Sequence, residues 1–152
     1  MHVNTNEDLV KTLNDLLKDE LSAIETYGQA LEKLARDVVA RPELEECRKS
    51  HIERAQRLRD TVHGLGGHPA RSSGLWGAVA KLVQGGAKVL GADATIAALE
   101  EGEDYGVRRY QDSLEKMDPA ISRMVRDDLL PGQLRTHDRI SALKASRSGS
   151  RT

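Results

Sequence analysis

The stretch LNDLLKDELSAIETYGQALEKL, residues 13–34, decides the fold of this 152-residue chain. Its apolar residues recur at alternating spacings of three and four, which places them on one face of an α-helix. The same spacing extends over about residues 6–39, and the face consists of Leu9, Leu13, Leu16, Glu20, Ile24, Tyr27, Leu31 and Leu34. The sequence therefore predicts a long amphipathic helix that directs one carboxylate, from Glu20, toward the core.

A second copy of this pattern lies 83 residues further along the chain. Both copies contain a Glu, a Tyr seven residues later and then Leu-Glu-Lys followed by an apolar residue. The helix that follows each copy adds a histidine. The recurring residues are Glu20 and Glu103, Tyr27 and Tyr110, and then His51 and His137. This ordered recurrence predicts two helical hairpins of the same design.

Three further long helices are expected from the same spacing. They cover about residues 42–65, the segment from Asp93 to Met117, and the segment from Pro119 onward. In the last one, Pro131 predicts a kink or a break near Leu130, because proline lacks an amide hydrogen. Its inward row is expected to be Ile121, Val125, Leu130, Leu134, His137 and Ile140. Four such helices predict an all-α protein, an antiparallel four-helix bundle.

The connection between the two hairpins, residues 66–93, is expected to cross over the bundle. It contains LWGAVAKLVQGGAKVL, residues 75–90, whose spacing predicts a short crossover helix. We expect one domain over residues 1–145 and a flexible tail, residues 146–152, because SRSGSRT is small, polar and basic. The apolar crossover helix is a candidate for self-association into a dimer or higher oligomer, and both segments are candidates for binding a protein partner.

Composition and charge exclude several functional classes. The 23 basic and 24 acidic residues give a net charge of −1, so the chain lacks the basic surface that nucleic-acid binding needs. A transmembrane helix is not expected, because no run of 18 apolar residues occurs. The first residues lack the pattern of a secretory signal peptide, and the single cysteine, Cys47, cannot form an internal disulfide. We therefore expect a cytoplasmic protein.

One ionisable residue interrupts the apolar row of each of the four helices. These residues are Glu20, His51, Glu103 and His137. Buried ionisable groups need partners, so we expect the four side chains to meet inside the bundle. Tyr27, Tyr110 and Cys47 lie on the same faces and are expected next to this cluster. In contrast, Arg54, Arg57 and Arg59 are expected on the solvated side of the second helix.

The pattern resembles the ferritin-like superfamily, whose bundles consist of two helical hairpins joined by a long crossover. The phrases LNDLLKDELSAIETYGQALEKL, HGLGGHP, GLWGAVAKL and EEGEDYG also resemble a bacterial group of ferritin-like proteins catalogued as a domain of unknown function. In the superfamily, two helices each supply a metal-binding Glu and the other two each supply a Glu-x-x-His pair. The resemblance therefore implies metal binding by Glu20, His51, Glu103 and His137.

The chain departs from the superfamily pattern at two positions. Arg48 and Leu134 lie three residues before His51 and His137, where the superfamily has the glutamates that bridge two irons. The remaining two Glu and two His suit one divalent ion, Fe, Mn or Zn. This reading predicts metal storage or the handling of oxidative stress, and it leaves open whether the protein is an enzyme. The alternative is a non-enzymatic stress-associated or assembly bundle with a metal-free buried network of Glu, His and Tyr.

Overall fold

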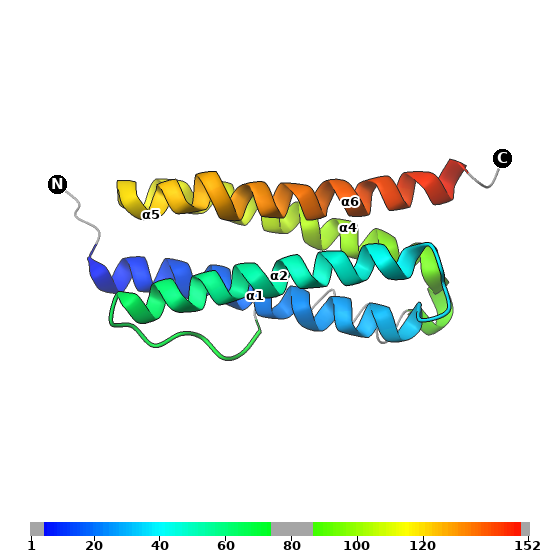
Figure 1. Cartoon of the computed structure of the whole chain (residues 1–152), viewed down its shortest axis with the longest axis horizontal. Helices are drawn as coiled ribbons and strands as arrows, with labels where there is room; N and C mark the ends of the chain where they lie inside the picture. Colours follow the sequence, from blue (N-terminus) through cyan, green and yellow to red (C-terminus); the bar gives the residue numbers. More distant parts are fainter. Residues whose placement is uncertain (1–4, 74–86, 150–152) are drawn as a thin grey trace.

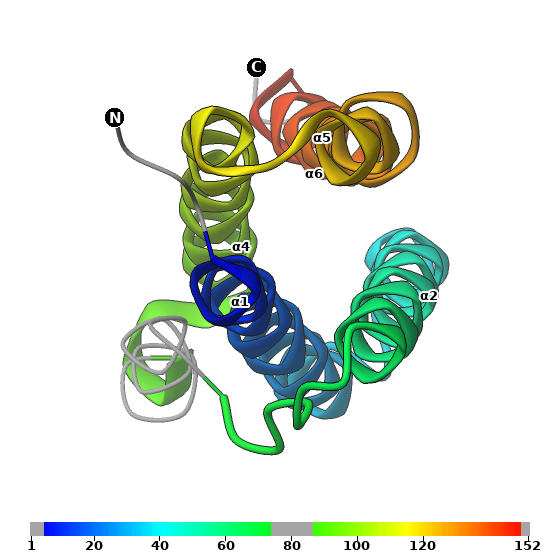
Figure 2. The ribbon, with the colours of Figure 1, turned by 90° about the vertical axis from the view of Figure 1, so that its left-hand side faces the viewer.

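The computed structural model describes residues 5–73 and 87–149, and within them it is all-helical, without β-strands, as predicted. Four long helical segments lie side by side (Figure 1 and Figure 2). They are α1 (Asn6–Lys33), α2 (Ala40–Gly64), α4 (Ala87–Ser113) and a composite fourth segment. That segment consists of α5 (Pro119–Met124), the π-helical turn η3 (Val125–Leu129) and α6 (Leu130–Gly149), and the 3-10 turn η2 (Leu114–Lys116) precedes it.

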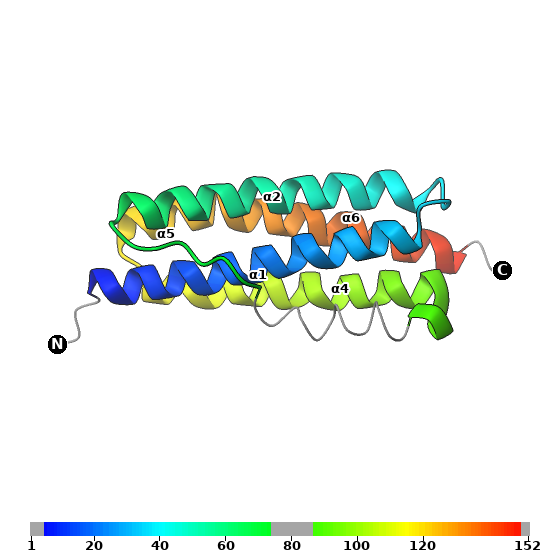
Figure 3. The same cartoon turned by 90° about the horizontal axis from the view of Figure 1, so that it is seen from below.

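Neighbouring segments run in opposite directions. The colours in Figure 3 show that α1 and α4 lie side by side with opposite chain directions, and Figure 1 shows the same for α1 and α2. The most extensive pairings are α1 with α2 and α4 with α6. None of the helices in the described ranges is long and apolar enough to cross a membrane.

Capping side chains set the ends of the first two helices. The Thr5 hydroxyl accepts a hydrogen bond from the Asp8 amide, and the Asp8 carboxylate accepts one from the Thr5 amide, so the first turn of α1 is closed reciprocally. At the start of α2, the Asp37 carboxylate accepts from the Ala40 amide at 2.9 Å. Beyond the end of α2, Gly66 has a φ of 80°, a conformation that glycine commonly adopts just after a helix.

The connection between the hairpins is described only in part. The expected crossover helix, residues 75–90, lies outside the described residues as far as residue 86. Residues 87–90 form the first turn of α4, and Gly91 then interrupts the helix with a φ of 79° and a ψ of −168°. Few residues other than glycine adopt a positive φ, so a glycine suits this interruption. The uninterrupted part of α4 starts beyond Gly91, close to the helix start predicted at Asp93.

The aliphatic core is divided into two clusters along the bundle. One cluster contains Ala23, Tyr27, Ala30, Leu34, Ala40, Leu44, Cys47, Ile96, Leu99, Ile140 and Leu143. The other contains Leu9, Leu13, Leu16, Leu17, Ala55, Leu58, Val62, Tyr110, Met117, Val125 and Leu129. On α1, α2 and α4 the residues that separate the clusters are Glu20, His51 and Glu103, all of which are buried. A polar section therefore crosses the middle of the core.

The fourth segment turns a different face inward from the predicted one. Leu134 is 40% exposed, whereas the buried row consists of Val125, Leu129, Gln133, Thr136, Ile140 and Leu143. Pro131 has no amide hydrogen to continue the helical ladder, and the chain forms a π-turn just before it, in which the Leu130 amide bonds to the Val125 carbonyl. The predicted kink near Leu130 is thus a π-turn within a continuous helical run.

The C-terminal part of the chain is more ordered than expected. Residues 146–149, which the composition assigns to a flexible tail, continue α6. Arg147 holds them in place, because its guanidinium contacts the Asp93 carboxylate at 2.7 Å and the Asp37 carboxylate at 2.8 Å. These ion pairs tie the end of α6 to the start of α4 and to the loop between α1 and α2.

Candidate functional site

Four buried ionised side chains meet in the polar section of the core. They are Glu20 on α1, His51 and Arg54 on α2, and Glu103 on α4, and we call them the charged layer. Each of them is at most 4% exposed. Burying a charge is costly unless it is paired and hydrogen-bonded, so the contacts within the layer decide whether the bundle is stable.

His51 bridges the two carboxylates of the layer. Its Nδ1 atom lies 2.5 Å from Glu20 Oε1, and its Nε2 atom lies 2.7 Å from Glu103 Oε2. Each ring nitrogen faces a carboxylate oxygen, an arrangement that suits an imidazolium ring, which donates a hydrogen from both nitrogens. Burial and the charge of Arg54 lower the pKa of His51, but the two carboxylates outweigh both and keep this pKa above its usual value.

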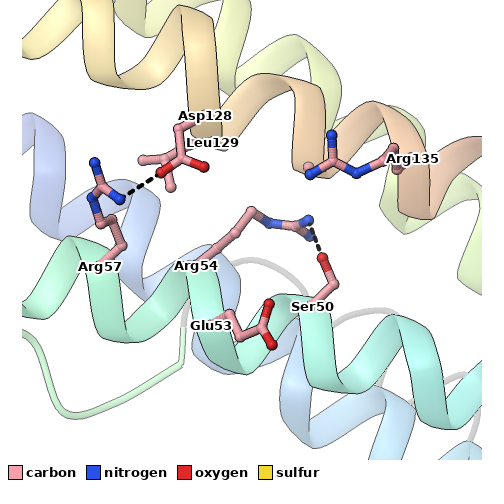
Figure 4. Close-up of a pocket in the computed structure, with 8 residues that line it drawn as sticks. Ser50, Glu53, Arg54, Arg57, Asp128, Leu129 and Arg135 are labelled. Carbon is pink, nitrogen blue, oxygen red and sulfur yellow. Dashed lines mark hydrogen bonds and ion pairs between the residues drawn. The ribbon is translucent and has the colours of Figure 1, made fainter.

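Arg54 is the second cation of the layer. Its Nε donates to Glu20 Oε2 at 2.6 Å, and its Nη1 donates to the Ser50 hydroxyl at 2.8 Å (Figure 4). Its Nη2 lies 2.7 Å from Nδ1 and 3.2 Å from Nε2 of His51, so two cations are in contact. The carboxylates beside them hold the pair together. Arg54 is thus at the centre of the layer, not on the solvated face where the sequence analysis places it.

The two tyrosines of the repeat also donate hydrogen bonds to the carboxylates of the layer. Tyr27 donates its hydroxyl hydrogen to Glu103 and Tyr110 donates to Glu20, both at 2.5 Å. Burial and the neighbouring carboxylates raise the pKa of both tyrosines well above its usual value, so both remain protonated donors. Burial also raises the pKa of the Glu20 carboxyl, but Arg54 and the other partners more than offset it and set this pKa at about 2.

The fourth segment supplies neutral donors and acceptors. Gln133 Nε2 donates to Glu103 Oε1 at 2.8 Å, and the Thr136 hydroxyl donates to the same oxygen at 2.7 Å. In return, Arg54 Nη2 donates to Gln133 Oε1 at 3.1 Å and to the Thr136 hydroxyl at 3.3 Å. A methyl group at Gly106 would lie 2.4 Å from Gln133 Nε2, so only glycine leaves room for this amide.

With His51 protonated, the layer carries no net charge. Glu20 and Glu103 contribute two negative charges, since the pKa of each lies below its usual value, and His51 and Arg54 contribute two positive charges. Burial opposes the charge on Glu103, but His51, Tyr27 and Arg54 outweigh it. Four charges are therefore buried as a neutral, hydrogen-bonded unit.

The structure places His137, the fourth predicted metal ligand, outside this layer. Its side chain is 27% exposed, and its Nε2 atom lies 2.5 Å from the Asp104 carboxylate on the outer side of α4. Cys47 is buried beside the layer, with its sulfur 3.9 Å from the Thr136 carbonyl oxygen. Burial, followed by the Glu103 charge, raises the pKa of the Cys47 thiol to about 12, so it stays neutral.

Sequence reasoning missed Arg54, Gln133 and Thr136. A usable signal was present, because His51 and Gln133 are 82 residues apart, as are Arg54 and Thr136. This separation nearly equals the offset of 83 between the Glu and Tyr positions. Each half therefore contributes one inward pair of residues at i and i+3 from its second helix. The pairs are His51 with Arg54 and Gln133 with Thr136.

Comparison with known proteins gives one match. A family described as Domain of unknown function (DUF2383) matches residues 8–116, more than two thirds of the chain. The chain belongs to this family. No curated protein and no solved structure matches the chain.

The DUF2383 match covers only part of the site. It covers α1 from Asp8 onward, α2, α4 and η2, and so it contains all four residues of the charged layer. It ends before α5, so the DUF2383 region does not include Gln133 and Thr136. The charges of the layer thus lie within the family domain, and the neutral partners lie beyond it.

Proposed function

We propose that the chain is a ferritin-like, antiparallel four-helix bundle with a non-enzymatic structural or assembly role, held together by a charged layer that needs no metal. The opposite directions of neighbouring helices in Figure 1 and Figure 3 support the bundle assignment, and so do the matching Glu and Tyr positions of the two halves. The observation that carries the proposal is the position of Arg54 between Glu20, His51 and the fourth segment.

The residues of the layer do not fit the iron, manganese or zinc ion that the superfamily resemblance implies. A histidine binds such an ion through the lone pair of a neutral ring nitrogen, but both nitrogens of His51 face carboxylates. Glu20 Oε2 already accepts from Arg54 and from Tyr110. A guanidinium at the centre also repels a divalent cation. Within the described ranges, no three His, Cys, Asp or Glu side chains converge in a way that could hold a metal ion.

The two cations of the layer supply the charge that a divalent ion would bring. Imidazolium and guanidinium together contribute two positive charges next to two carboxylates, so the site is neutral with its own residues. Removing one partner of such a buried pair is strongly destabilising, which ties the stability of the bundle to the layer. Every charged group of the layer contacts another residue of the chain. We therefore infer that the layer serves the structure or assembly of the bundle.

Metal analysis tests the proposal. We expect protein purified from cells grown with added iron, manganese and zinc to contain far less than one ion per chain by elemental analysis. We also expect EDTA to leave its thermal midpoint unchanged, since a ligand that binds only the folded state would raise that midpoint. Stoichiometric metal that is lost in Glu20→Ala but retained in Glu7→Ala, an exposed control on the same helix, would overturn the proposal.

Self-association into a dimer or higher oligomer and a cytoplasmic location remain predictions within the same proposal. The apolar crossover segment, residues 75–90, carries the prediction of self-association. Light scattering coupled to size-exclusion chromatography tests it directly. A monomer at all concentrations up to the millimolar range would contradict it.

A further inference from the structure

A groove between α2 and the fourth segment leads from the surface to the charged layer. It encloses a cavity of about 230 Å³. Its walls are Ser50, Glu53, Arg54 and Arg57 on α2, with Asp128, Leu129, Gly132 and Arg135 opposite them. Figure 4 shows the guanidinium groups of Arg54 and Arg135 extending toward one another from the two walls. Two arginines that face one cavity are a typical arrangement for recognising an oxyanion.

Hydrogen-bond donors in this groove exceed the available acceptors. A guanidinium has five N–H donors, and Arg54 directs one to Glu20, two to the fourth segment and one to Ser50. Its Nη1 atom, which lies beside Gly132 on the wall of the groove, carries a second N–H beyond the one donated to Ser50. The Ser50 hydroxyl accepts from Arg54, and its own hydrogen has no acceptor in the described part of the chain. Arg135 makes no hydrogen bond or ion pair with any described residue. A bound oxyanion would satisfy these three donors together.

Among the described residues, Arg135 is the cation of the groove that has no acidic partner. Arg54 is neutralised by Glu20, and Arg57 pairs with Asp128 at 2.8 Å, which closes one end of the groove. The remaining charges are those of Arg135 and of Glu53, which lies on the opposite wall. Gly132 matters for access, because a methyl group there would lie 3.1 Å from Arg54 Nη1 and would narrow the space above the guanidinium.

We propose that this groove binds a small oxyanion, a carboxylate or a phosphate group, between Arg54, Ser50 and Arg135. The Arg135 guanidinium supplies a positive charge and a planar pair of donors. The Arg54 N–H and the Ser50 hydroxyl supply donors at the buried end. The inference shares the position of Arg54 with the proposed function, but its test does not depend on metal content, since none of these three groups is a candidate metal ligand.

Thermal unfolding with added anions tests the site. The probes are sodium phosphate and sodium acetate, each compared with sodium chloride at the same ionic strength. A phosphate or acetate concentration of about ten times the dissociation constant should raise the midpoint by roughly 3–6 °C. Comparing the two anions separates a phosphate site from a carboxylate site. A midpoint that responds to both no more than to chloride overturns the proposal.

Two variants with opposite expected effects sharpen the test. Arg135→Ala changes an exposed residue outside the charged layer and should weaken anion binding about 10- to 100-fold, the loss of a charged hydrogen-bonding partner. Glu53→Gln removes the competing carboxylate and should tighten binding about two- to fivefold. Arg123→Ala, on the same segment but outside the groove, should change nothing. An anion response that is unchanged in Arg135→Ala would also overturn the proposal.

Discussion

Tyr27 donates a hydrogen bond to Glu103 at 2.5 Å, although the two residues belong to different copies of the internal repeat. Tyr110 donates the equivalent hydrogen bond to Glu20. The reason is geometric: α1 and α4 lie side by side in opposite directions (Figure 3), and Glu and Tyr are seven residues apart in both. Each tyrosine is therefore opposite the glutamate of the other copy. The Tyr–Glu hydrogen bonds of the repeat therefore join the two halves.

Replacing either tyrosine by phenylalanine should destabilise the fold. Tyr27→Phe removes a hydrogen bond to a buried carboxylate and leaves one oxygen of Glu103 with fewer donors, so we expect a loss of about 1.5–3 kcal/mol. Urea unfolding of the purified variant measures it. Tyr105→Phe is the matched control, because Tyr105 is only partly buried, and it should cost far less. Equal losses in the two variants would contradict the role assigned to Tyr27.

Removing Arg54 should be among the most damaging single changes on α2. Arg54→Ala leaves the Glu20 carboxylate buried without its guanidinium partner, and we expect a loss of about 3–5 kcal/mol. Arg57 lies on the same helix as Arg54, and Arg57→Ala breaks an exposed ion pair with Asp128 of the fourth segment. This change should cost about 0–1 kcal/mol. Thermal or urea unfolding of both variants provides the comparison. Similar stabilities would mean that Arg54 is solvated, as its sequence context suggests.

Protonation of His51 makes part of the stability dependent on pH. The folded pKa of His51 is raised above the unfolded value, about 6.5. The stabilisation is therefore complete below that unfolded value and is lost as the pH rises through the folded pKa. The difference in unfolding free energy between the parent and His51→Gln should be constant in mild acid and should shrink at alkaline pH.

Two measurements check the protonation of His51. Urea unfolding at several pH values gives the free-energy difference, with His63→Gln at the exposed end of α2 as the control. Nitrogen chemical shifts of His51 at neutral pH should be those of an imidazolium ring. A neutral ring, or a difference that does not change between acid and alkaline pH, would refute the assignment of a buried cation.

Gly106 provides a steric test of the neutral half of the site. Gly106→Ala places a methyl group 2.4 Å from Gln133 Nε2 and should displace this amide from Glu103, at a cost of about 1–3 kcal/mol. Gly64→Ala, at the end of α2, meets nothing within 4 Å and should be neutral or slightly stabilising. Unfolding midpoints of the two variants decide between steric conflict and a general effect of adding a methyl group to a helix.

Most of the fold and three of the four residues of the layer could be predicted from the sequence. The spacing of apolar residues predicts the helices, and Glu20, His51 and Glu103 attract attention because each interrupts an apolar row. Arg54 was not predictable by the same reasoning, because an arginine on a helix rich in basic residues is usually solvated. Its burial depends on partners from α1 and from the fourth segment, which a pattern confined to one helix does not include.

The buried face of the fourth segment was the other feature that the sequence pattern did not predict. Leu129 and Leu130 are adjacent and point about 100° apart, so the hydrophobic pattern alone does not choose between them. His137 is the more conspicuous residue beside Thr136, yet the π-turn before Pro131 sets the face that is buried. Gln133 and Thr136 are then stabilised in the core by Glu103, whose carboxylate lies on another helix.

Neutrality of the charged layer also determines which hairpins can pair. The α1–α2 hairpin contributes one carboxylate and two cations, an excess of one positive charge, while the α4–α6 hairpin contributes Glu103 and an excess of one negative charge. Two identical hairpins that came together would bury two like charges without compensation, which is costly in a core. A duplicated sequence risks the pairing of two like halves from different molecules. The second helices of the two halves differ at their inward positions, which are His51 and Arg54 in one half and Gln133 and Thr136 in the other. Because of this difference, only unlike halves neutralise each other's buried charge.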